Sequence, residues 1–213
     1  MDTKQVFSQY GSTGGDRPSK ARYCPRCGTA CVTKDVAGKS RAVCPCCGFI
    51  EFLNPSPVIA VLVRNDDSIL LGRRSGGSFK AGAWSLPCGY IEFDEDFLSA
   101  AIREAREETG LDIELESIVN VAYNYLSPKI HSLAVVLLAR PIGGTLCAGD
   151  DFDEVRWIPL SAPLPPLAFE SDDYVIGRLR KGDLGGIAVD SRFSRRKDPA
   201  PASARSTGST EGF

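Results

Sequence analysis

Apolar residues follow a helical period in the centre of the chain. Five of them fall three and four residues apart, the spacing of one buried helix face: Phe97, Leu98, Ala101, Ile102 and Ala105. The acidic residues 94–96 favour the positive end of a helix dipole, and Gly110 lies where a C-terminal glycine is expected. The pattern therefore predicts a helix that begins near residues 94–96 and ends at Gly110.

Apolar runs on both sides of this helix predict strands. Residues 58–63 form a buried run, 65–67 a turn, and 68–73 a strand that returns antiparallel. Residues 118–123, 131–139 and 155–158 are also strand-like, and 174–180 are predicted to form a closing helix. The chain has no internal repeat.

The predicted central helix carries Glu104, Glu107 and Glu108 on one edge, because at about 100° per residue they span roughly a third of the circumference. Carboxylates at this spacing repel one another by about 0.2–0.5 kcal/mol per pair, and a cation removes that penalty. Such hard oxygen ligands suit Mg²⁺ or Mn²⁺ and, through the metal, a phosphate. The alternative is a solvated acidic face balanced by Arg103 and Arg106.

The spacing around the glutamates decides between these alternatives. The run from Gly89 to Leu111 reads Gly-x5-Glu-x7-Arg-Glu-U-x-Glu-Glu-x-Gly-U, where U is aliphatic and Ala105 is accepted as the first U. This run resembles the Nudix box at every specified position. The resemblance implies an α/β fold, an α/β/α sandwich around a mixed sheet. It also implies a hydrolase that cleaves a nucleoside diphosphate linked to another group.

The same resemblance implies the roles of the residues in the box. Glu104, Glu107 and Glu108 correspond to the catalytic, metal-binding glutamates. The backbone carbonyl of Cys88, just before the box glycine Gly89, resembles a further metal ligand.

Two further expectations concern charged residues at the ends of the box and after it. Glu95 and Arg103 are expected to form a structural ion pair that holds the loop on the helix. Family members often supply an extra metal ligand or the general base from a later loop. Here Glu154 is the candidate, with Asp151 or Asp153 as substitutes.

The residues that contact the substrate are less clearly indicated by the sequence than the box residues are. Arg73 and Arg74 follow a strand, where basic residues often contact phosphate in this family. Tyr123 and Tyr125 could stack on a base or flavin ring, although strand tyrosines more often pack in the core or at its rim. His131 is the only histidine, and its position at the start of a strand favours a structural role over that of a general base.

A second motif lies upstream of the box. Cys24 with Cys27 and Cys44 with Cys47 form two C-P-x-C-G knuckles, separated by sixteen residues that include a predicted hairpin. This spacing predicts a zinc ribbon with a tetrahedral four-cysteine site, which is structural because four thiolates leave no open position for water. The alternatives are disulfides or free thiols, and no signal peptide places the chain in an oxidising compartment. The other four cysteines are expected to be ordinary thiols.

Length and composition predict how the chain is divided into domains. The 213 residues, 43% of them hydrophobic, suffice for one full core and a small module. We expect a flexible arm at 1–21, the zinc ribbon at 22–53, the Nudix domain at 54–182 and a disordered, partly basic tail at 183–213. The net charge of −2 argues against a nucleic-acid partner, and no apolar run reaches the length of a membrane span. A cytoplasmic protein is expected, with an organellar address left open.

The ribbon before the Nudix domain narrows the choice of substrate. NADH pyrophosphatases that also remove NAD caps from RNA carry a Ser-Gln-Pro-Trp-Pro-Phe-Pro signature after the box, which this chain lacks. Residues 52–55 and 164–169 resemble instead the zinc-ribbon Nudix hydrolases related to FAD and ADP-ribose pyrophosphatases. That resemblance favours ADP-ribose or FAD, with release of AMP. The NADH or NAD-cap activity, a non-catalytic nucleotide-sensing or nucleic-acid-binding regulator, and a homodimer stay open.

Overall fold

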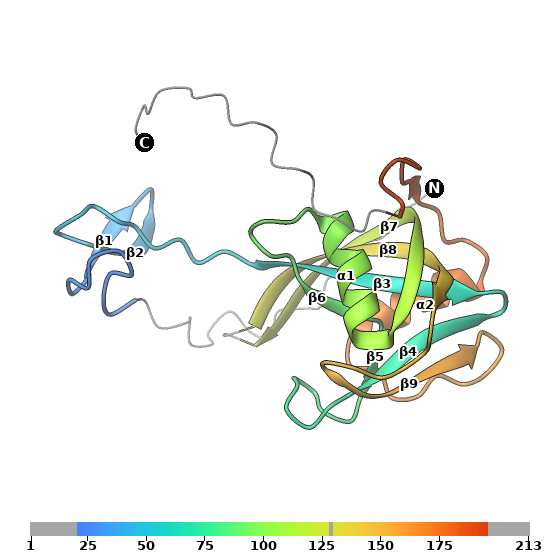
Figure 1. Cartoon of the computed structure of the whole chain (residues 1–213). Helices are drawn as coiled ribbons and strands as arrows, with labels where there is room; N and C mark the ends of the chain where they lie inside the picture. Colours follow the sequence, from blue (N-terminus) through green and yellow to red (C-terminus); the bar gives the residue numbers. More distant parts are fainter. Residues whose placement is uncertain (1–20, 128–129, 196–213) are drawn as a thin grey trace.

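A mixed sheet flanked by helices forms the larger part of the computed structural model, which describes residues 21–127 and 130–195, with side chains for all of these except 125–127 and 130 (Figure 1). Its strands are β3 (Ser56–Asn65), β4 (Ser68–Arg74), β5 (Trp84–Ser85), β6 (Cys88–Tyr90), β7 (Leu111–Ser127), β8 (Ile130–Gly144), β9 (Phe152–Pro159) and β10 (Ile187–Ala188). The order is β10-β7-β8-β3-β4-β5, and β6 pairs with β3 while β9 pairs with β4. Only β3 and β8 run parallel among these pairs.

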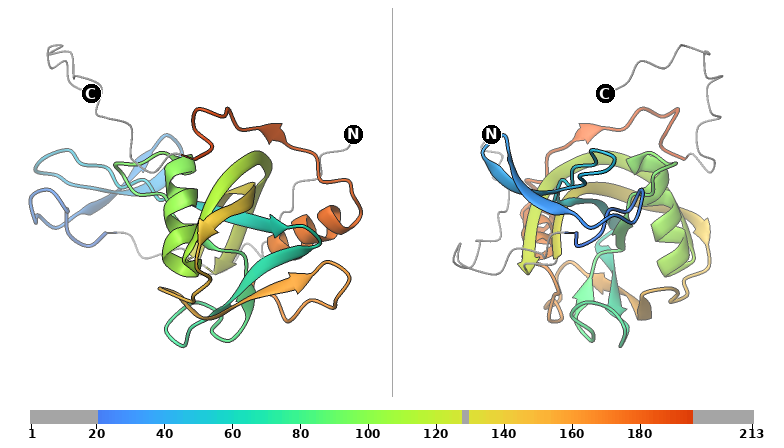
Figure 2. Two further views of the ribbon diagram at one scale, coloured as in Figure 1. Left: turned by 45° about the vertical axis from the view of Figure 1, so that its right-hand side comes forward. Right: turned by 90° about the vertical axis from the view of Figure 1, so that its left-hand side faces the viewer.

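The two helices, α1 (Phe97–Thr109) and α2 (Glu170–Arg180), cover opposite faces of the sheet (Figures 1 and 2). Alternate residues of β3 enter different cores, because successive side chains of a strand point to opposite faces. Val61 and Val63 pack with the alanines of α1, whereas Leu62 packs with Val175 and Ile176 of α2. The α/β/α sandwich expected from the sequence is confirmed.

Helix α1 begins and ends where its sequence predicts. The Asp96 side chain accepts hydrogen bonds from the backbone N–H groups of Leu98, at 2.9 Å, and Ser99, at 3.0 Å. Gly110 ends the helix in the left-handed conformation, with a φ of 70°. A Cβ atom at this position would lie 2.3 Å from the Thr145 carbonyl oxygen, so only glycine fits.

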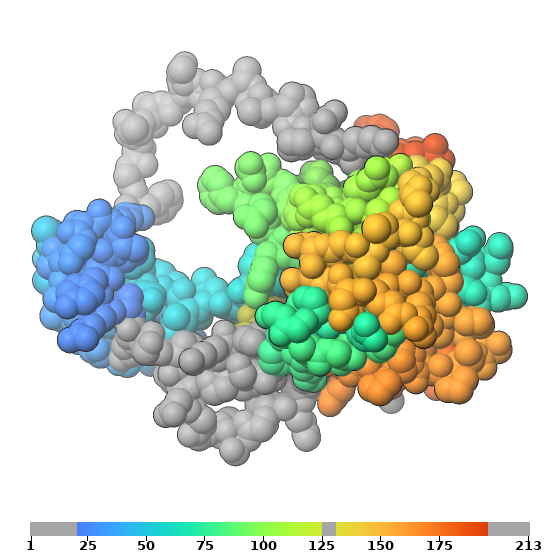
Figure 3. All heavy atoms as spheres, turned by 60° about the horizontal axis from the view of Figure 1, so that its bottom comes forward, coloured from blue at the N-terminus to red at the C-terminus, as the bar shows by residue number. Residues whose placement is uncertain are grey.

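The N-terminal module is a two-stranded hairpin of β1 (Val32–Val36) and β2 (Lys39–Val43). Gly38, with a φ of 72°, makes the turn between the strands. The module lies to one side of the sheet domain, and an extended segment leads from it into β3 (Figures 1 and 3).

The predicted disordered tail is wrong for residues 183–195. Strand β10 pairs with Ile118 and Ser117 of β7, and the Leu115 N–H donates to the Ser194 carbonyl at 2.8 Å. Backbone hydrogen bonds to the edge of a sheet require no apolar side chains, so a Gly- and Ser-rich sequence can form them. Residues 196–213, and almost all of the arm predicted at 1–21, lie outside the described residues.

Neither helix of the described chain has the length and apolar character that crossing a bilayer requires.

Candidate active site

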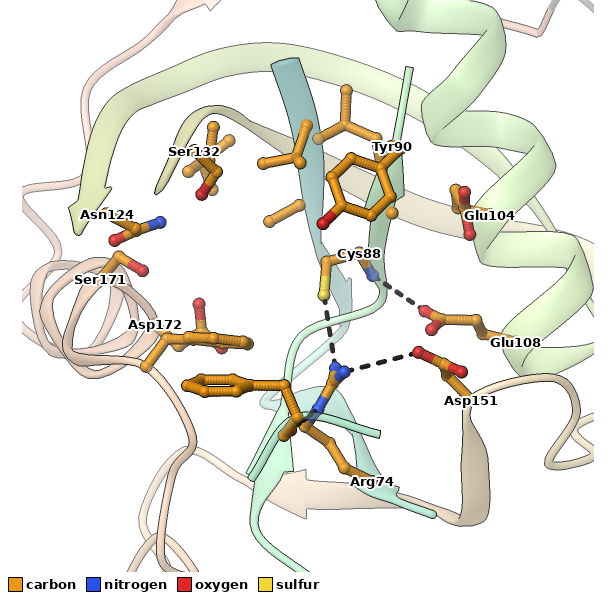
Figure 4. Close-up of a pocket in the computed structure, with 18 of the residues that line it drawn as sticks. Arg74, Cys88, Tyr90, Glu104, Glu108, Asn124, Ser132, Asp151, Ser171 and Asp172 are labelled. Atoms are coloured by element: carbon orange, nitrogen blue, oxygen red, sulfur yellow. Dashed lines mark hydrogen bonds and ion pairs between the residues drawn. The ribbon is translucent and has the colours of Figure 1, made fainter. Parts of the chain in front are cut away.

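A cavity of about 270 Å³ lies on the α2 side of the sheet (Figure 4). Glu104, Glu108 and Asp151 stand at one end of it, and Asn124, Ser132 and Ser171 at the other, with Arg74 and Cys88 between them. The cavity thus joins the glutamate edge of α1 to the beginning of α2.

The glutamates of α1 are held by the backbone of β6. Glu108 is only 1% exposed, and its Oε2 accepts a 2.8 Å hydrogen bond from the Cys88 N–H. The Glu104 carboxylate lies directly against Gly89, where a Cβ atom would be 2.0 Å from Oε1. A side chain at position 89 would therefore displace the Glu104 carboxylate from its place against β6.

Arg103 connects the acidic residues of the box to one another. Its guanidinium donates to Glu95 at 2.6 Å, to Glu104 at 2.7 Å, to Glu107 at 2.9 Å and to the Tyr90 carbonyl at 3.1 Å. The ion pair with Glu95 that the sequence predicts is thus present. The hydrogen bond from Arg103 lowers the pKa of Glu95, and these contacts together raise the pKa of Arg103.

Three carboxylates are close enough to share a divalent cation. Glu104, Glu107 and Asp150 each offer an oxygen, and these atoms lie within 4.8 Å of one another. Burial raises the pKa of Glu104, and it raises the pKa of Glu108 to about 9. A nearby cation favours the ionised form of each carboxylate, so the residues fit Mg²⁺ or Mn²⁺.

The expectation that Glu154 joins this group is wrong. Its side chain pairs with Arg73, at 3.2 Å, and with Arg156, and it does not line the cavity. The register between β4 and β9 shifts between Arg73 and Arg74, which changes the partners across the strands. Asp150 and Asp151, earlier in the same acidic run, reach the cavity instead.

The same shift separates the two arginine candidates. Arg73 forms a 2.7 Å ion pair with Asp153 and does not line the cavity. Arg74 is 7% exposed and does line it. Its Nε donates to the Phe79 carbonyl at 2.6 Å, and its Nη2 lies 3.5 Å from Asp151. A buried guanidinium held in this way is suited to bind a phosphate oxygen.

Of the two aromatic candidates, only the Tyr123 side chain is described. Tyr123 is absent from the lining, and its ring makes an edge contact with His131 at a centroid distance of 4.5 Å. The Tyr125 side chain lies outside the described residues.

Four polar residues at the far end of the cavity were missed by sequence reasoning: Asn124, Ser132, Ser171 and Asp172. A signal existed for Ser132, which begins the otherwise apolar run 132–139. Asn124 did not stand out, because Asn120 and several charged residues lie in the same strand. Asp172 is 4% exposed and accepts a 3.1 Å hydrogen bond from the Leu86 N–H. Burial raises the pKa of Asp172 to about 7.

The four cysteines of the hairpin module form a separate cluster. Their sulfur atoms all lie within 4.8 Å of one another, and the Cys24–Cys47 and Cys27–Cys44 distances are both 3.5 Å. Tetrahedral zinc with 2.3 Å bonds requires sulfur atoms about 3.8 Å apart, so the cluster fits this ion. None of the eight cysteines, all of which are described, forms a disulfide, and the four outside the cluster do not join it.

Known proteins resemble the larger part of the chain. The family model of the NUDIX domain matches residues 54–179. An ADP-ribose pyrophosphatase of Methanocaldococcus jannaschii is 35% identical over 133 residues, which cover 61% of this chain and 76% of that protein. The chain belongs to the Nudix family. The predicted family and enzyme class are therefore confirmed.

Other Nudix proteins extend the comparison. The NAD-capped RNA hydrolase NudC of Pseudomonas aeruginosa is 32% identical over 160 residues, 74% of this chain and 54% of the relative. This Nudix hydrolase therefore spans about half the length of that relative. The crystal structure of a NUDIX hydrolase from Nitrosomonas europaea superposes with a TM-score of 0.64 at 24% identity, covering 76% of this chain and 91% of the other. The latter likeness establishes the fold.

In this Nudix hydrolase, the box glutamates and the acidic run after β8 thus meet at one end of a cavity that also contains a buried arginine. Oxygen ligands for a cation beside a fixed positive charge are the arrangement that a pyrophosphate requires.

Proposed function

We propose that this Nudix hydrolase cleaves the diphosphate of ADP-ribose to AMP and ribose 5-phosphate, and that FAD is a second substrate cleaved to AMP and FMN. One observation carries the proposal. The carboxylates of α1, then Arg74, then a polar end with Asn124 and Asp172 line one cavity from end to end. A ligand with a diphosphate at one end and an uncharged group at the other matches this order of side chains along the cavity. The name and 35% identity of the archaeal relative support the choice of ADP-ribose.

The proposed cation site consists of Glu104, Glu107 and Asp150, with Glu108 and the Cys88 carbonyl as further ligands. When bound, Mg²⁺ or Mn²⁺ would neutralise phosphate charge and supply a water of lowered pKa. Arg103 balances the carboxylates in the absence of the ion, because it already contacts Glu104 and Glu107.

The protein side chains then have separate tasks in the reaction. Arg74 would bind a phosphate oxygen and hold the phosphorus in line for attack. Water adds to that phosphorus while its bond to the bridging oxygen breaks, and the leaving phosphate takes the electron pair. Asp151, which lines the cavity beside Arg74, would accept the proton of the attacking water.

A second candidate activity is the hydrolysis of NADH or of NAD caps on RNA. It is favoured by the 32% identity to NudC over 74% of this chain. The same end of the cavity would perform the chemistry, so the two candidates differ in the group attached to the diphosphate.

We propose a structural role for the hairpin module at 22–53, with Zn²⁺ bound by Cys24, Cys27, Cys44 and Cys47. Four thiolates complete the coordination of zinc and exclude a reacting water. The small hairpin depends on such a metal, since it buries few side chains of its own.

The deciding experiment measures AMP release from ADP-ribose, FAD, NADH, NAD and an NAD-capped RNA, with Mg²⁺ or Mn²⁺. Glu108→Gln is the inactive comparison. Glu116→Gln is the matched control, since Glu116 is a partly exposed residue of β7 outside the cavity. We expect metal-dependent turnover that is fastest with ADP-ribose. Preference for NADH or capped RNA would identify a different substrate. The absence of AMP release from every compound in the panel would contradict the proposed activity.

A further inference from the structure

The end of the cavity opposite the glutamates is lined by polar side chains. Asn124 and Ser132 are 7% and 8% exposed and line the cavity. They are direct neighbours across β7 and β8. Neither the Asn124 amide nor the Ser132 hydroxyl makes a hydrogen bond to another described residue. Both side chains face the cavity, so a ligand bound there can form hydrogen bonds with them.

The first turn of α2 closes this end from the other side. Ser171 and Asp172 are each 4% exposed and line the cavity. Asp172 accepts the Leu86 N–H through Oδ2, and the Ser171 side chain also hydrogen-bonds to this carboxylate. A carboxylate oxygen can accept more than one hydrogen bond, so Asp172 can still receive one from a ligand in the cavity. Figure 4 shows Asp172 on the same side of the cavity as Asn124.

The space between these polar groups has apolar walls. Val58 and Ala60 of β3 and Ala134 and Val136 of β8 follow the two-residue period that places them on one face of the sheet. The two alanines hollow this face, and Phe169 stands before α2 as a further wall. A flat ring with polar atoms on its edge fits such a space, whereas a sugar would leave hydroxyl groups against the apolar walls.

We infer that this end of the cavity binds the nucleotide base edge-on, and that Asn124 and Asp172 select adenine over a 6-oxo purine. The inference rests on the proposed function and adds the residues that set its base specificity. The Asp172 carboxylate accepts a hydrogen bond from the exocyclic amino group, and the Asn124 amide donates to a ring nitrogen. A 6-oxo base would place an acceptor opposite the carboxylate and leave both without a partner.

The test compares AMP with IMP, and ADP-ribose with its inosine analogue, at pH 8.5. Binding of the monophosphates is measured by calorimetry, and cleavage of the two sugar diphosphates by kcat/KM. We expect a preference for adenine of about 10- to 100-fold in both measurements, because a site that hydrogen-bonds one group rejects an analogue that lacks it.

Asp172→Asn is the informative variant. Its Oδ1 can still accept the Leu86 N–H, while its amide presents a donor where the carboxylate presented an acceptor. We expect the adenine preference to fall about tenfold or more, toward the 6-oxo base. Asp173→Asn is the matched control, since Asp173 is exposed on the same helix and lies outside the cavity. Asn124→Ala gives a second measurement and is expected to weaken AMP binding with unchanged thermal stability.

The outcomes separate this inference from the proposed function. Cleavage of ADP-ribose with a base preference that neither Asp172→Asn nor Asn124→Ala alters would overturn the inference and leave the function standing. Binding of AMP over IMP that depends on Asp172, without cleavage of any nucleotide in the panel, would support the inference and overturn the function.

Discussion

The four cysteines of the hairpin and the carboxylates around α1 are both candidate metal sites, and they are constructed in opposite ways. The cysteines come from two tight turns of one small module, and their four sulfur atoms lie within 4.8 Å of one another. The carboxylates come from a helix and a distant loop, and only three of them meet that distance. Four thiolates would complete the tetrahedral shell of a zinc ion, whereas three carboxylates would leave positions open on a six-coordinate Mg²⁺.

The difference extends to the surroundings. No cavity residue belongs to the cysteine cluster, whereas Glu104 and Asp150 line the described cavity. The carboxylates are also kept together by Arg103, which contacts Glu95, Glu104 and Glu107. A closed set of ligands stabilises a fold, and an open set beside a cavity can bind substrate. The following predictions test this division of roles.

The largest effect is expected for Glu108→Gln. The amide cannot ionise to serve as a charged ligand for the cation, and we expect kcat for ADP-ribose to fall about 10³-fold or more. AMP release measures the loss, and circular dichroism with thermal unfolding tests whether the fold persists. A variant with near-normal metal-dependent turnover would show that the open cluster is not the reaction centre.

Gly89→Ala should disturb the same cluster through geometry alone. The new Cβ atom would lie 2.0 Å from Glu104 Oε1, so the carboxylate must move. We expect a loss of about 10²-fold in kcat/KM, the size associated with a displacement of about 1 Å, together with weaker Mg²⁺ binding. Gly177→Ala is the control, because a Cβ atom there meets nothing within 4 Å. Unchanged metal affinity in Gly89→Ala would argue against Glu104 as a ligand.

Metal affinity at the open cluster should depend on pH. Burial raises the pKa of Glu108 to about 9, so an ion that needs the carboxylate must release its proton below that pH. We expect Mg²⁺ affinity to rise between pH 6 and pH 9, by at most about tenfold per unit, and to level off above. Calorimetry across this range measures the effect, and Glu108→Gln should reduce it. Equal affinity at pH 6.5 and pH 8.5 would contradict the prediction.

The raised pKa of Glu108 also makes the stability of the fold depend on pH. In the metal-free protein Glu108 keeps its proton up to about pH 9, whereas in the unfolded chain it ionises near 4.5. Its contribution is therefore fully present below pH 4.5 and declines as pH rises toward 9. Saturating Mg²⁺ should offset this decline in thermal unfolding.

The smallest effect on activity is expected for Cys44→Ser. Loss of one thiolate should release zinc and unfold the hairpin module, whereas kcat/KM for ADP-ribose should stay within about threefold, since the ribbon supplies no cavity residue. Metal analysis and AMP release measure the two results. Cys46→Ser is the matched control, because Cys46 is an exposed neighbour outside the cluster. Loss of activity together with zinc would show that the two clusters are coupled.

Sequence reasoning succeeded where a pattern is local. The apolar spacing and caps of α1 lie within its own residues, and the helix runs over Phe97–Thr109 as expected. The glycine, arginine and glutamates of the box are close in the chain, so their contacts could also be anticipated. The four cysteines likewise occupy turns whose shape depends on neighbouring residues.

The rest depended on contacts between distant segments. Glu154 and Asp150 belong to one acidic run, and the register shift opposite Arg74 decides which of them reaches the cavity. Tyr123 was the more conspicuous residue, yet its neighbour Asn124 points into the cavity, because successive strand residues face opposite sides. Composition alone does not tell which of two neighbouring strand residues faces the cavity.

Strand β10 affects where the chain can be truncated. The family match ends at residue 179, but the sheet continues to Ile187 and Ala188, and the Val189 N–H donates to Glu116 at 2.9 Å. A chain cut at the family boundary would leave the outer side of β7 with unpaired N–H and C=O groups, a template for self-association between copies. The residues after α2 cover part of this edge, so we expect a chain that keeps residues to about Arg195 to self-associate less than one cut at residue 179.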